Sequence, residues 1–195
     1  MDIVGSLVAL VLSLPLLVVI AFAIALDSRG PILFRQQRVG LRGRPFTLLK
    51  FRSMRMGSDD TLHQSHIADL IQRGASAPAA KLTNDPRVTR VGRLLRRTSL
   101  DEWPQFLNVL AGSMSLVGPR PPIPYEVEHY AEWHKARLQV KPGITGLWQV
   151  SARSQVSFDD MVRLDLAYAE SWSLWLDVKI LFHTVRAVMS GRGAS

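Results

Sequence analysis

Cysteine is absent from the 195-residue sequence, which excludes disulfide bonds and thiolate metal sites and suits a protein of a reducing compartment. The signatures GxGxxG, P-loop, HExxH and GxSxG are absent too, so the chemistries that depend on them have no support. Acidic residues are few: 16 Asp and Glu against 24 Lys and Arg give a net charge of +8. The expected partners are therefore anionic, such as nucleic acid, lipid headgroups or phosphorylated substrates. The length predicts one domain with an appendage.

Charge of either sign is absent from residues 3–26. As a helix this run would measure about 36 Å, more than the roughly 30 Å hydrocarbon core of a bilayer, so residues 1–28 are predicted to be a membrane anchor. Pro15 leaves the Val11 carbonyl without an amide partner, and the Ser13 hydroxyl could partly satisfy the freed backbone. Two interpretations stay open: a kinked helix that spans the bilayer, slightly favoured by composition, and a helix that dips into one leaflet and returns. Under both, the basic residues that follow put the C-terminal side in the cytoplasm: Arg29, Arg35, Arg38, Arg42 and Arg44.

A β-hairpin is predicted over residues 31–52, because two short β-prone runs flank the turn Gly40-Leu41-Arg42-Gly43. Lys50 and Arg52 belong to the basic platform that it would present beside the membrane. An equally open alternative is a patch that only binds anionic lipid, at about 1 kcal/mol per basic residue. Residues 57–83 are polar, then rich in Ala and Gly, and are interpreted as a variable insertion.

Two adjacent carboxylates, Asp101 and Glu102, follow a segment whose charges from residue 87 to 100 are all basic. Ser99 and Glu102 have the spacing of a capping box, which predicts a new helix with Asp101 in its first turn. Helical spacing puts Arg96 on a different face from the other arginines. An ionised carboxylate among phosphate-neutralising groups can serve as a nucleophile or a metal ligand. The alternative without a function is that the two carboxylates only cap a helix and that the arginines before them form a solvated basic face.

Two loops present further arginines. Prolines flank Arg120 in Gly118-Pro119-Arg120-Pro121-Pro122, and they would hold it rigidly, as suits an arginine that binds a phosphate. A plain proline-rich connector is an equally open alternative. Arg153 lies in a polar loop after a glycine-containing turn and a short extended piece at residues 141–150. Helices are predicted over residues 103–110 and 124–140. Residues 158–188 are also helical in pattern, and either lie in the membrane interface, as their tryptophans, aliphatic and basic residues suggest, or pack in the core.

Several motifs in this order are found together in one known family. The sequence resembles the monotopic phosphoglycosyl transferases, the bacterial sugar transferase family that starts O-antigen (lipopolysaccharide), capsule and exopolysaccharide assembly. The residues that carry the resemblance are Gly30-Pro31 with Phe34-Arg35-Gln36, Lys50-Phe51-Arg52-Ser53-Met54, Arg96 with Thr98-Ser99-Leu100-Asp101-Glu102, Asn108-Val109-Leu110, Met114 to Pro121, and Pro142-Gly143-Ile144-Thr145-Gly146.

The resemblance covers nearly the whole chain and implies an α+β, mainly helical fold. Its N-terminal membrane helix would be re-entrant and broken at Pro15, which replaces the slight preference for a span; Ser13 stands one place before the position where members often have serine. A small β-hairpin and a helical catalytic domain with interfacial amphipathic helices would follow over residues 29–195. Larger members carry extra membrane helices and a further domain, so the chain is expected to be the minimal catalytic unit.

The resemblance also implies an enzyme that transfers a phosphosugar from a UDP-sugar to polyprenyl (undecaprenyl) phosphate and releases UMP. Asp101 would be the nucleophile of a phosphosugar-aspartate intermediate, and Asp101 and Glu102 would hold Mg²⁺. Expected partners are the UDP-sugar, polyprenyl phosphate, lipid of the bacterial inner membrane at its cytoplasmic face, and a second copy of the chain, with no nucleic acid. The expected phosphate-binding residues are Arg96, Arg120, Lys50, Arg52 and Arg153.

Three rival functions follow from charge and anchor. A membrane-surface adaptor would tolerate loss of both carboxylates, and a nucleic-acid-binding protein would show salt-sensitive binding to duplexes, although the apolar anchor argues against it. A phosphatase acting on the same lipid would form product without a sugar nucleotide.

Overall fold

The computed structural model describes residues 1–55, 71, 87–151 and 156–189. Apart from Ile71, the predicted insertion at 57–83 lies outside the described residues, and so does Arg153. The described part is mainly helical, with two small two-stranded sheets, as the resemblance implies.

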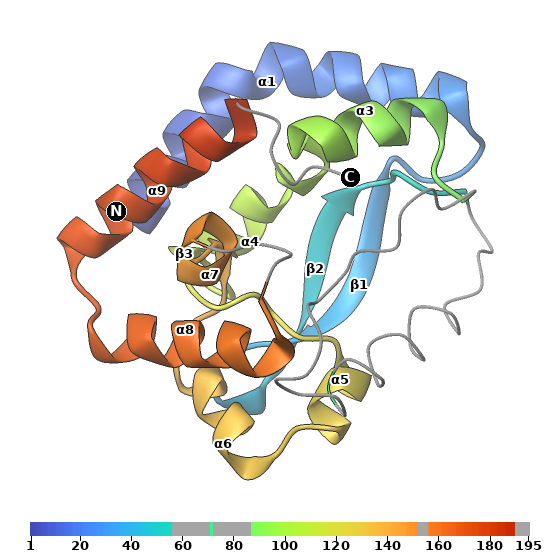
Figure 1. Ribbon diagram of the computed structural model, residues 1–195. Helices are drawn as coiled ribbons and strands as arrows, with labels where there is room; N and C mark the ends of the chain where they lie inside the picture. The colour runs from blue at the N-terminus through green and yellow to red at the C-terminus, as the bar shows by residue number, and fades with distance from the viewer. Residues whose placement is uncertain (56–70, 72–86, 152–155, 190–195) are drawn as a thin grey trace.

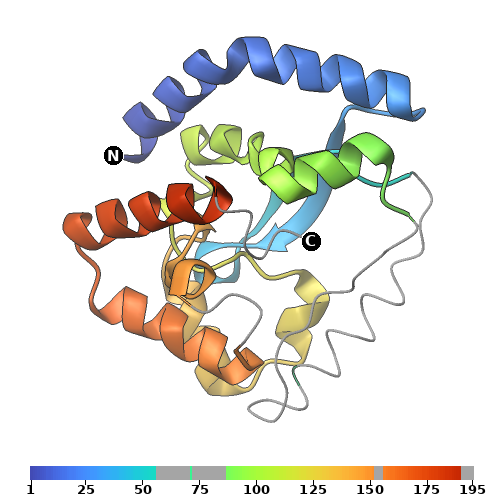
Figure 2. The same cartoon turned by 45° about the horizontal axis from the view of Figure 1, so that its top comes forward.

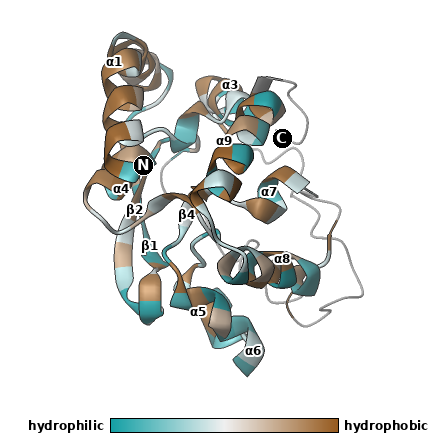
Figure 3. Ribbon diagram, turned by 90° about the vertical axis from the view of Figure 1, so that its left-hand side faces the viewer, coloured by the Kyte–Doolittle hydropathy of each residue, from teal (hydrophilic) through white to brown (hydrophobic). Residues whose placement is uncertain are grey.

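Helix α1 (Asp2–Asp27) is long and apolar enough to cross a membrane by length and composition. It curves over one side of the protein, with α3, α4 and α9 beneath it (Figures 1 and 2). Hydrophobic residues continue along it (Figure 3), yet only 17% of its most apolar window is buried. The stripe that faces the protein consists of Ser6, Ser13, Ile20 and Ile24.

The predicted break at Pro15 is not observed, because helical structure is assigned without interruption across this residue. The Ser13 hydroxyl donates to the Ala9 carbonyl at 2.7 Å, and more weakly to that of Leu10. It therefore bonds the preceding turn rather than the Val11 carbonyl that the proline leaves free.

The predicted hairpin is confirmed. Strands β1 (Leu33–Val39) and β2 (Pro45–Phe51) pair antiparallel, and the 3-10 turn η1 (Leu41–Gly43) joins them. Arg42 and Gly43 in that turn have positive φ values of 55° and 75°, a conformation that glycine adopts at little cost. The register places Phe34 opposite Lys50, so these two side chains lie on the same face of the hairpin.

The next elements carry the charged segment into the core. They are α3 (Arg90–Thr98), η3 (Leu100–Glu102), α4 (Gln105–Leu110), and the parallel strands β3 (Ser115–Val117) and β4 (Gly143–Thr145). The largest apolar cluster among the described residues joins the hairpin to α4, β3 and the C-terminal helices. Its buried members are Leu48, Val109, Met114, Leu116, Val117, Tyr168 and Ile180.

The helix predicted over residues 124–140 is in fact three short pieces: α5 (Pro124–Glu128), α6 (Glu132–Lys135) and the 3-10 helix η4 (Ala136–Gln139). The short extended piece expected within residues 141–150 is found as β4, but the chain then turns into α7 (Leu147–Ser151) instead of staying extended. The helical C-terminal region is confirmed as α8 (Phe158–Glu170) and α9 (Leu174–Met189).

Candidate active site

Helix α3 presents its arginines as the sequence predicts. Arg90, Arg93 and Arg97 are exposed, whereas Arg96 is partly buried and its Nε donates to the Ser53 hydroxyl at 3.0 Å. Arg96 therefore points inward, to the end of the hairpin.

The close fit of α3 against that end depends on a glycine. Thr89 caps the helix by accepting from the Gly92 amide at 2.9 Å, and a Cβ at Gly92 would lie 2.0 Å from the Ser53 carbonyl oxygen. The glycine thus lets the backbone of α3 touch the backbone that carries the partner of Arg96.

Ser99 does not form the predicted capping box. It ends α3 in the left-handed conformation (φ 57°, ψ 17°), its amide bonds the Arg96 carbonyl, and its side chain makes no cap hydrogen bond. Glu102 instead turns to Lys50, whose Nζ lies 2.8 Å from its Oε1. The ion pair was invisible in the local spacing because its partners are 52 residues apart.

Asp101 occupies the tight turn η3 and is only 9% exposed. Burial raises the pKa of its carboxyl group; the adjacent Glu102 acts in the same direction, while Lys50 and Arg96 oppose the rise. Burial also favours the protonated form of Glu102, but the charge and hydrogen bond of Lys50, with the charge of Arg120, hold the pKa of Glu102 below its ordinary value. The two neighbours are therefore differentiated: Glu102 is held as an anion, and Asp101 is the more basic carboxylate.

The proline loop presents Arg120 with its side chain exposed and its backbone held from several directions. The Val39 amide donates to the Pro122 carbonyl, and the Gly143 amide to that of Pro119, both at 2.9 Å. Two buried arginines complete this support. The Arg38 guanidinium donates to the Pro121 carbonyl at 2.8 Å, and that of Arg137 to the Arg120 carbonyl at 3.4 Å.

The sequence singled out neither Arg38 nor Arg137 as part of the site. Arg38 is 4% exposed, and burial together with the nearby Arg120 charge lowers the pKa of its guanidinium to about 10. Strand alternation offered a signal for Arg38, because it follows Phe34 by four residues and so shares the face of Lys50. Arg137 pairs with Asp165 in the interior, a contact between separate helices that no local pattern reveals.

Arg52 lies elsewhere. It is 3% exposed, and its guanidinium donates to the carbonyls of Ser28 (2.6 Å), Pro31 (2.7 Å) and Ile24 (3.2 Å) at the C-terminal end of α1. These contacts favour a structural role over the expected phosphate binding. Arg153 lies outside the described residues, so its role stays a prediction.

The adjacent carboxylates fit a magnesium ion that arrives with a substrate. Mg²⁺ is often bound through one or two carboxylates together with substrate phosphates, and Asp101 and Glu102 offer that donor set. Within the described part of the chain no group of three or more His, Cys, Asp or Glu residues is arranged to hold a metal.

Similarity to known proteins decides the family. The family profile described as "Bacterial sugar transferase" matches residues 1–191. The chain belongs to the bacterial sugar transferase family. The UDP-galactose-lipid carrier transferase of Erwinia amylovora is 47% identical over 193 residues, which cover 99% of this chain and 40% of that protein. The undecaprenyl-phosphate galactose phosphotransferase of Salmonella typhimurium is 46% identical, with the same coverage.

A relative of more similar length is the exopolysaccharide production protein ExoY of Rhizobium meliloti, 40% identical over 99% of this chain and 85% of that protein. The first two relatives are longer, and the chain spans about two fifths of their length. In this member of the bacterial sugar transferase family, the structure gathers Asp101, Glu102, Lys50, Arg96 and Arg120 around one turn.

Proposed function

We propose that the chain transfers a phosphosugar from a UDP-sugar to polyprenyl phosphate, the first membrane step in assembling an exopolysaccharide, capsule or O-antigen. The observation that carries the proposal is a poorly exposed, comparatively basic Asp101 carboxylate beside the Lys50–Glu102 ion pair and the inward-pointing Arg96. The names of the relatives support a lipid-linked sugar transfer, because two are a galactose-lipid carrier transferase and an undecaprenyl-phosphate galactose phosphotransferase.

The reaction proceeds in two displacements at one phosphorus atom. An Asp101 carboxylate oxygen attacks the sugar-bearing phosphorus of the UDP-sugar, the bond from that phosphorus to the UMP oxygen breaks, and UMP leaves. A phosphate oxygen of polyprenyl phosphate then attacks the same phosphorus, and the bond to Asp101 breaks. The products are the lipid diphosphate sugar and free Asp101. Two steps let two anionic substrates use the site in turn, which avoids their mutual repulsion.

The surrounding groups stabilise charge. Lys50 lowers the cost of an anion at Asp101, and Arg96 and the loop-held Arg120 supply donors for phosphate oxygens, Arg96 being already oriented by Ser53. Mg²⁺, held by Asp101 and Glu102 with the donor's diphosphate, would neutralise charge on that diphosphate.

Helix α1 would anchor the enzyme without crossing the bilayer. Asp2 Oδ1 accepts from the Leu116 amide at 3.3 Å, and Asp27 Oδ2 accepts from the Val91 amide at 3.0 Å, so both ends of the helix are bonded to the same domain. A spanning helix would carry one end about 30 Å away, across the hydrocarbon core. This geometry supports an anchor that stays on one side of the bilayer, at the cytoplasmic face of the inner membrane; a return at Pro15 stays a prediction, because α1 is continuous there.

Helix α9 supports the same placement. Its buried side packs in the core through Ile180, with Leu176 and Leu181 partly buried against it. A second apolar face remains exposed, and the Lys179 ammonium lies 5.4 Å from the centroid of the Trp175 ring, a combination suited to the membrane interface. The exposed apolar residues of α9 are Leu174, Trp175, Val178, Phe182, Val185 and Val188. The second copy of the chain, expected from the sequence, stays a prediction.

The nucleophile can be tested by trapping. Enzyme mixed with UDP-sugar radiolabelled in the sugar, without lipid acceptor, should release UMP and become labelled, and polyprenyl phosphate should then remove the label. Asp101→Asn should lose labelling and turnover by several orders of magnitude, whereas Glu132→Gln, at a carboxylate 89% exposed, should behave like the wild type. Full turnover by Asp101→Asn would refute the assignment.

A further inference from the structure

An apolar groove runs between the C-terminal half of α1 and the hairpin. Its volume is about 810 Å³, within the range of roughly 300–1,000 Å³ that is usual for small-molecule sites. Two arginines, Arg35 and Arg52, add the basic part of the lining. The apolar walls are Leu17, Val18 and Ala21 of α1, with Ile32, Phe34 and Phe51 of the connector and hairpin.

The groove is open on the side of the membrane helix. Val18 and Phe34 line it and yet are 50% and 42% exposed, so the domain itself does not fill the space between them. Because one wall is the helix proposed to lie in the bilayer, an occupant would enter from lipid. Lipid chains are as apolar as these walls, so the groove would select an occupant by the shape of its chain and by its charged end.

One wall leads directly to the candidate active site. Phe34 stands opposite Lys50 in the strand ladder and shares its face of the hairpin, whereas Phe51, the next residue along β2, packs against Ile20 and Ile24 of α1. The Lys50 ammonium contacts Glu102 at 2.8 Å, next to Asp101. An apolar chain lying against Phe34 would therefore bring a terminal group towards Lys50 and the reacting carboxylate.

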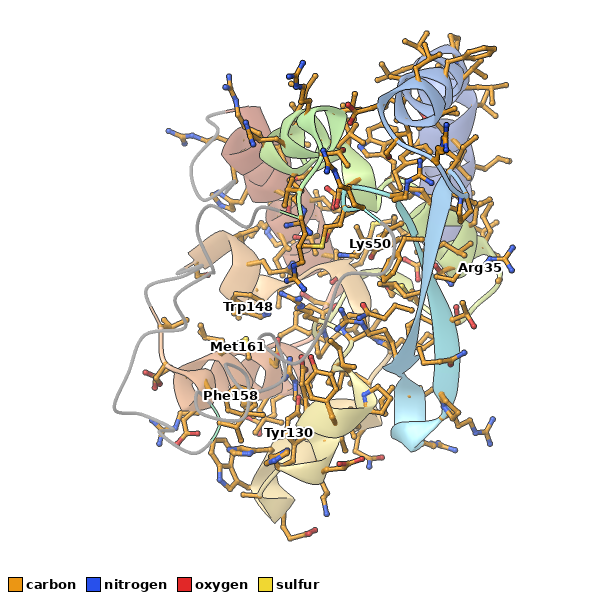
Figure 4. All side chains as sticks on the ribbon, turned by 90° about the vertical axis from the view of Figure 1, so that its right-hand side faces the viewer. Arg35, Lys50, Tyr130, Trp148, Phe158 and Met161 are labelled. Carbon is orange, nitrogen blue, oxygen red and sulfur yellow. The ribbon has the colours of Figure 1, made fainter. Side chains whose placement is uncertain are left out.

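The charge of the lining indicates the sign of that terminal group. Arg35 is exposed and extends from the hairpin away from the body of the protein (Figure 4), and no carboxylate of the described residues lies within ion-pair distance of it. Arg52 is occupied by three carbonyls but still adds positive potential. The lining thus suits a molecule with an apolar body and an anionic end.

We infer that the groove holds the first isoprene units of the polyprenyl phosphate acceptor, with the phosphate directed towards Lys50 and Asp101. The inference rests on the proposed function, and it names which surface recognises the lipid. The branched, unsaturated chain, rather than a straight acyl chain of the surrounding bilayer, would lie between α1 and the half-exposed Phe34.

The test separates the two half-reactions. Ala21→Phe fills the groove from α1, and Ala25→Phe is the matched control, because Ala25 is exposed one turn further along the same helix and does not line the groove. Each labelled enzyme is chased with polyprenyl phosphate and, separately, with a straight-chain alkyl phosphate. Ala21→Phe should become labelled by UDP-sugar but need about tenfold more polyprenyl phosphate for half-maximal chase, with a smaller change for the straight chain, and Ala25→Phe should match the wild type.

Equal chase kinetics in Ala21→Phe, Ala25→Phe and the wild type would overturn the inference and would mean that bulk lipid fills the groove. If Ala21→Phe fails to become labelled, Val18→Phe decides instead, because that half-exposed side chain lies outside the packed core, and the same tenfold shift is expected. Labelling that never appears on the wild-type enzyme would refute the proposed function and the groove with it. Normal labelling with an unchanged chase refutes the groove alone.

Discussion

Gly92→Ala should damage both stability and catalysis, although it adds one methyl group. In an exposed helix interior this change would gain about 1 kcal/mol, because alanine is the better helix former. Here the new Cβ would lie 2.0, 2.6 and 2.7 Å from the carbonyl oxygen, carbonyl carbon and Cα of Ser53. All three are backbone atoms, so no side chain can rotate away, and ordinary contact begins only at 3.4 Å.

The clash outweighs the propensity. Overpacking typically costs about 1–3 kcal/mol, and a collision of backbone with backbone belongs at the upper end, so we expect a net loss of about 2 kcal/mol. Helix α3 must also move by more than an ångström away from Ser53, which breaks the 3.0 Å hydrogen bond to Arg96. Misplacing a site by about 1 Å can cost about 100-fold in rate, so UMP release should fall by that order.

The assay compares urea denaturation in detergent micelles with the rate of UMP release. Gly5→Ala is the matched control, since it is also a glycine within a helix, but its Cβ would meet only the Leu116 Cδ1 atom, at 2.9 Å, the end of a flexible side chain. A Gly92→Ala enzyme as stable and as active as Gly5→Ala would refute the view that the approach of α3 to the hairpin sets the position of Arg96.

Two further predictions concern buried charge. Arg137→Met should lower the free energy of unfolding by about 3–5 kcal/mol, because it leaves the Asp165 carboxylate unpaired at 1% exposure. The control Arg163→Met, at a surface ion pair, should lower it by at most about 1 kcal/mol. Equal losses for the two variants in urea denaturation would contradict the prediction. Burial raises the pKa of Asp101 above the ordinary value of 3.8, and only the ionised carboxylate attacks. As the solution is acidified, the rate of labelling by UDP-sugar should therefore begin to fall at a higher pH than it would for an ordinary aspartate. A labelling rate that stays constant down to about pH 4, measured by rapid quenching, would be inconsistent with a raised pKa.

Local patterns predicted the elements whose causes are local. The hairpin follows from two β-prone runs around Gly40 and Gly43, and the direction of Arg96 follows from helical spacing alone. Likewise, the run of uncharged residues predicted the long helix α1. Each of these depends on residues within a few turns or one strand ladder of each other.

The errors arose where distant residues compete with a local pattern. Ser99 and Glu102 have the spacing of a capping box, but Lys50 offers the Glu102 carboxylate a charged partner from another strand, which is stronger than a backbone amide at a helix start. The phosphate-binding role expected of Arg52 as part of the basic platform stays a prediction, and the sequence did not indicate that its guanidinium bonds the carbonyls at the end of α1. The helix expected over residues 124–140 divides into short pieces, and no residue inside the segment indicated where these breaks occur.

Three consecutive residues at the end of the hairpin explain how the candidate site keeps a fixed position relative to α1. Lys50 turns to Glu102 at 2.8 Å, Phe51 packs in the apolar cluster with Ile24 of α1, and Arg52 bonds the Ile24 carbonyl at 3.2 Å. Neighbouring strand residues are only about 3.3 Å apart along the chain, so the reacting turn cannot move far from α1 without breaking one of these contacts. A shift of α1 along its axis would therefore reach Glu102 through Arg52 and Lys50, so the polar contacts at the end of α1 also hold the candidate site in place.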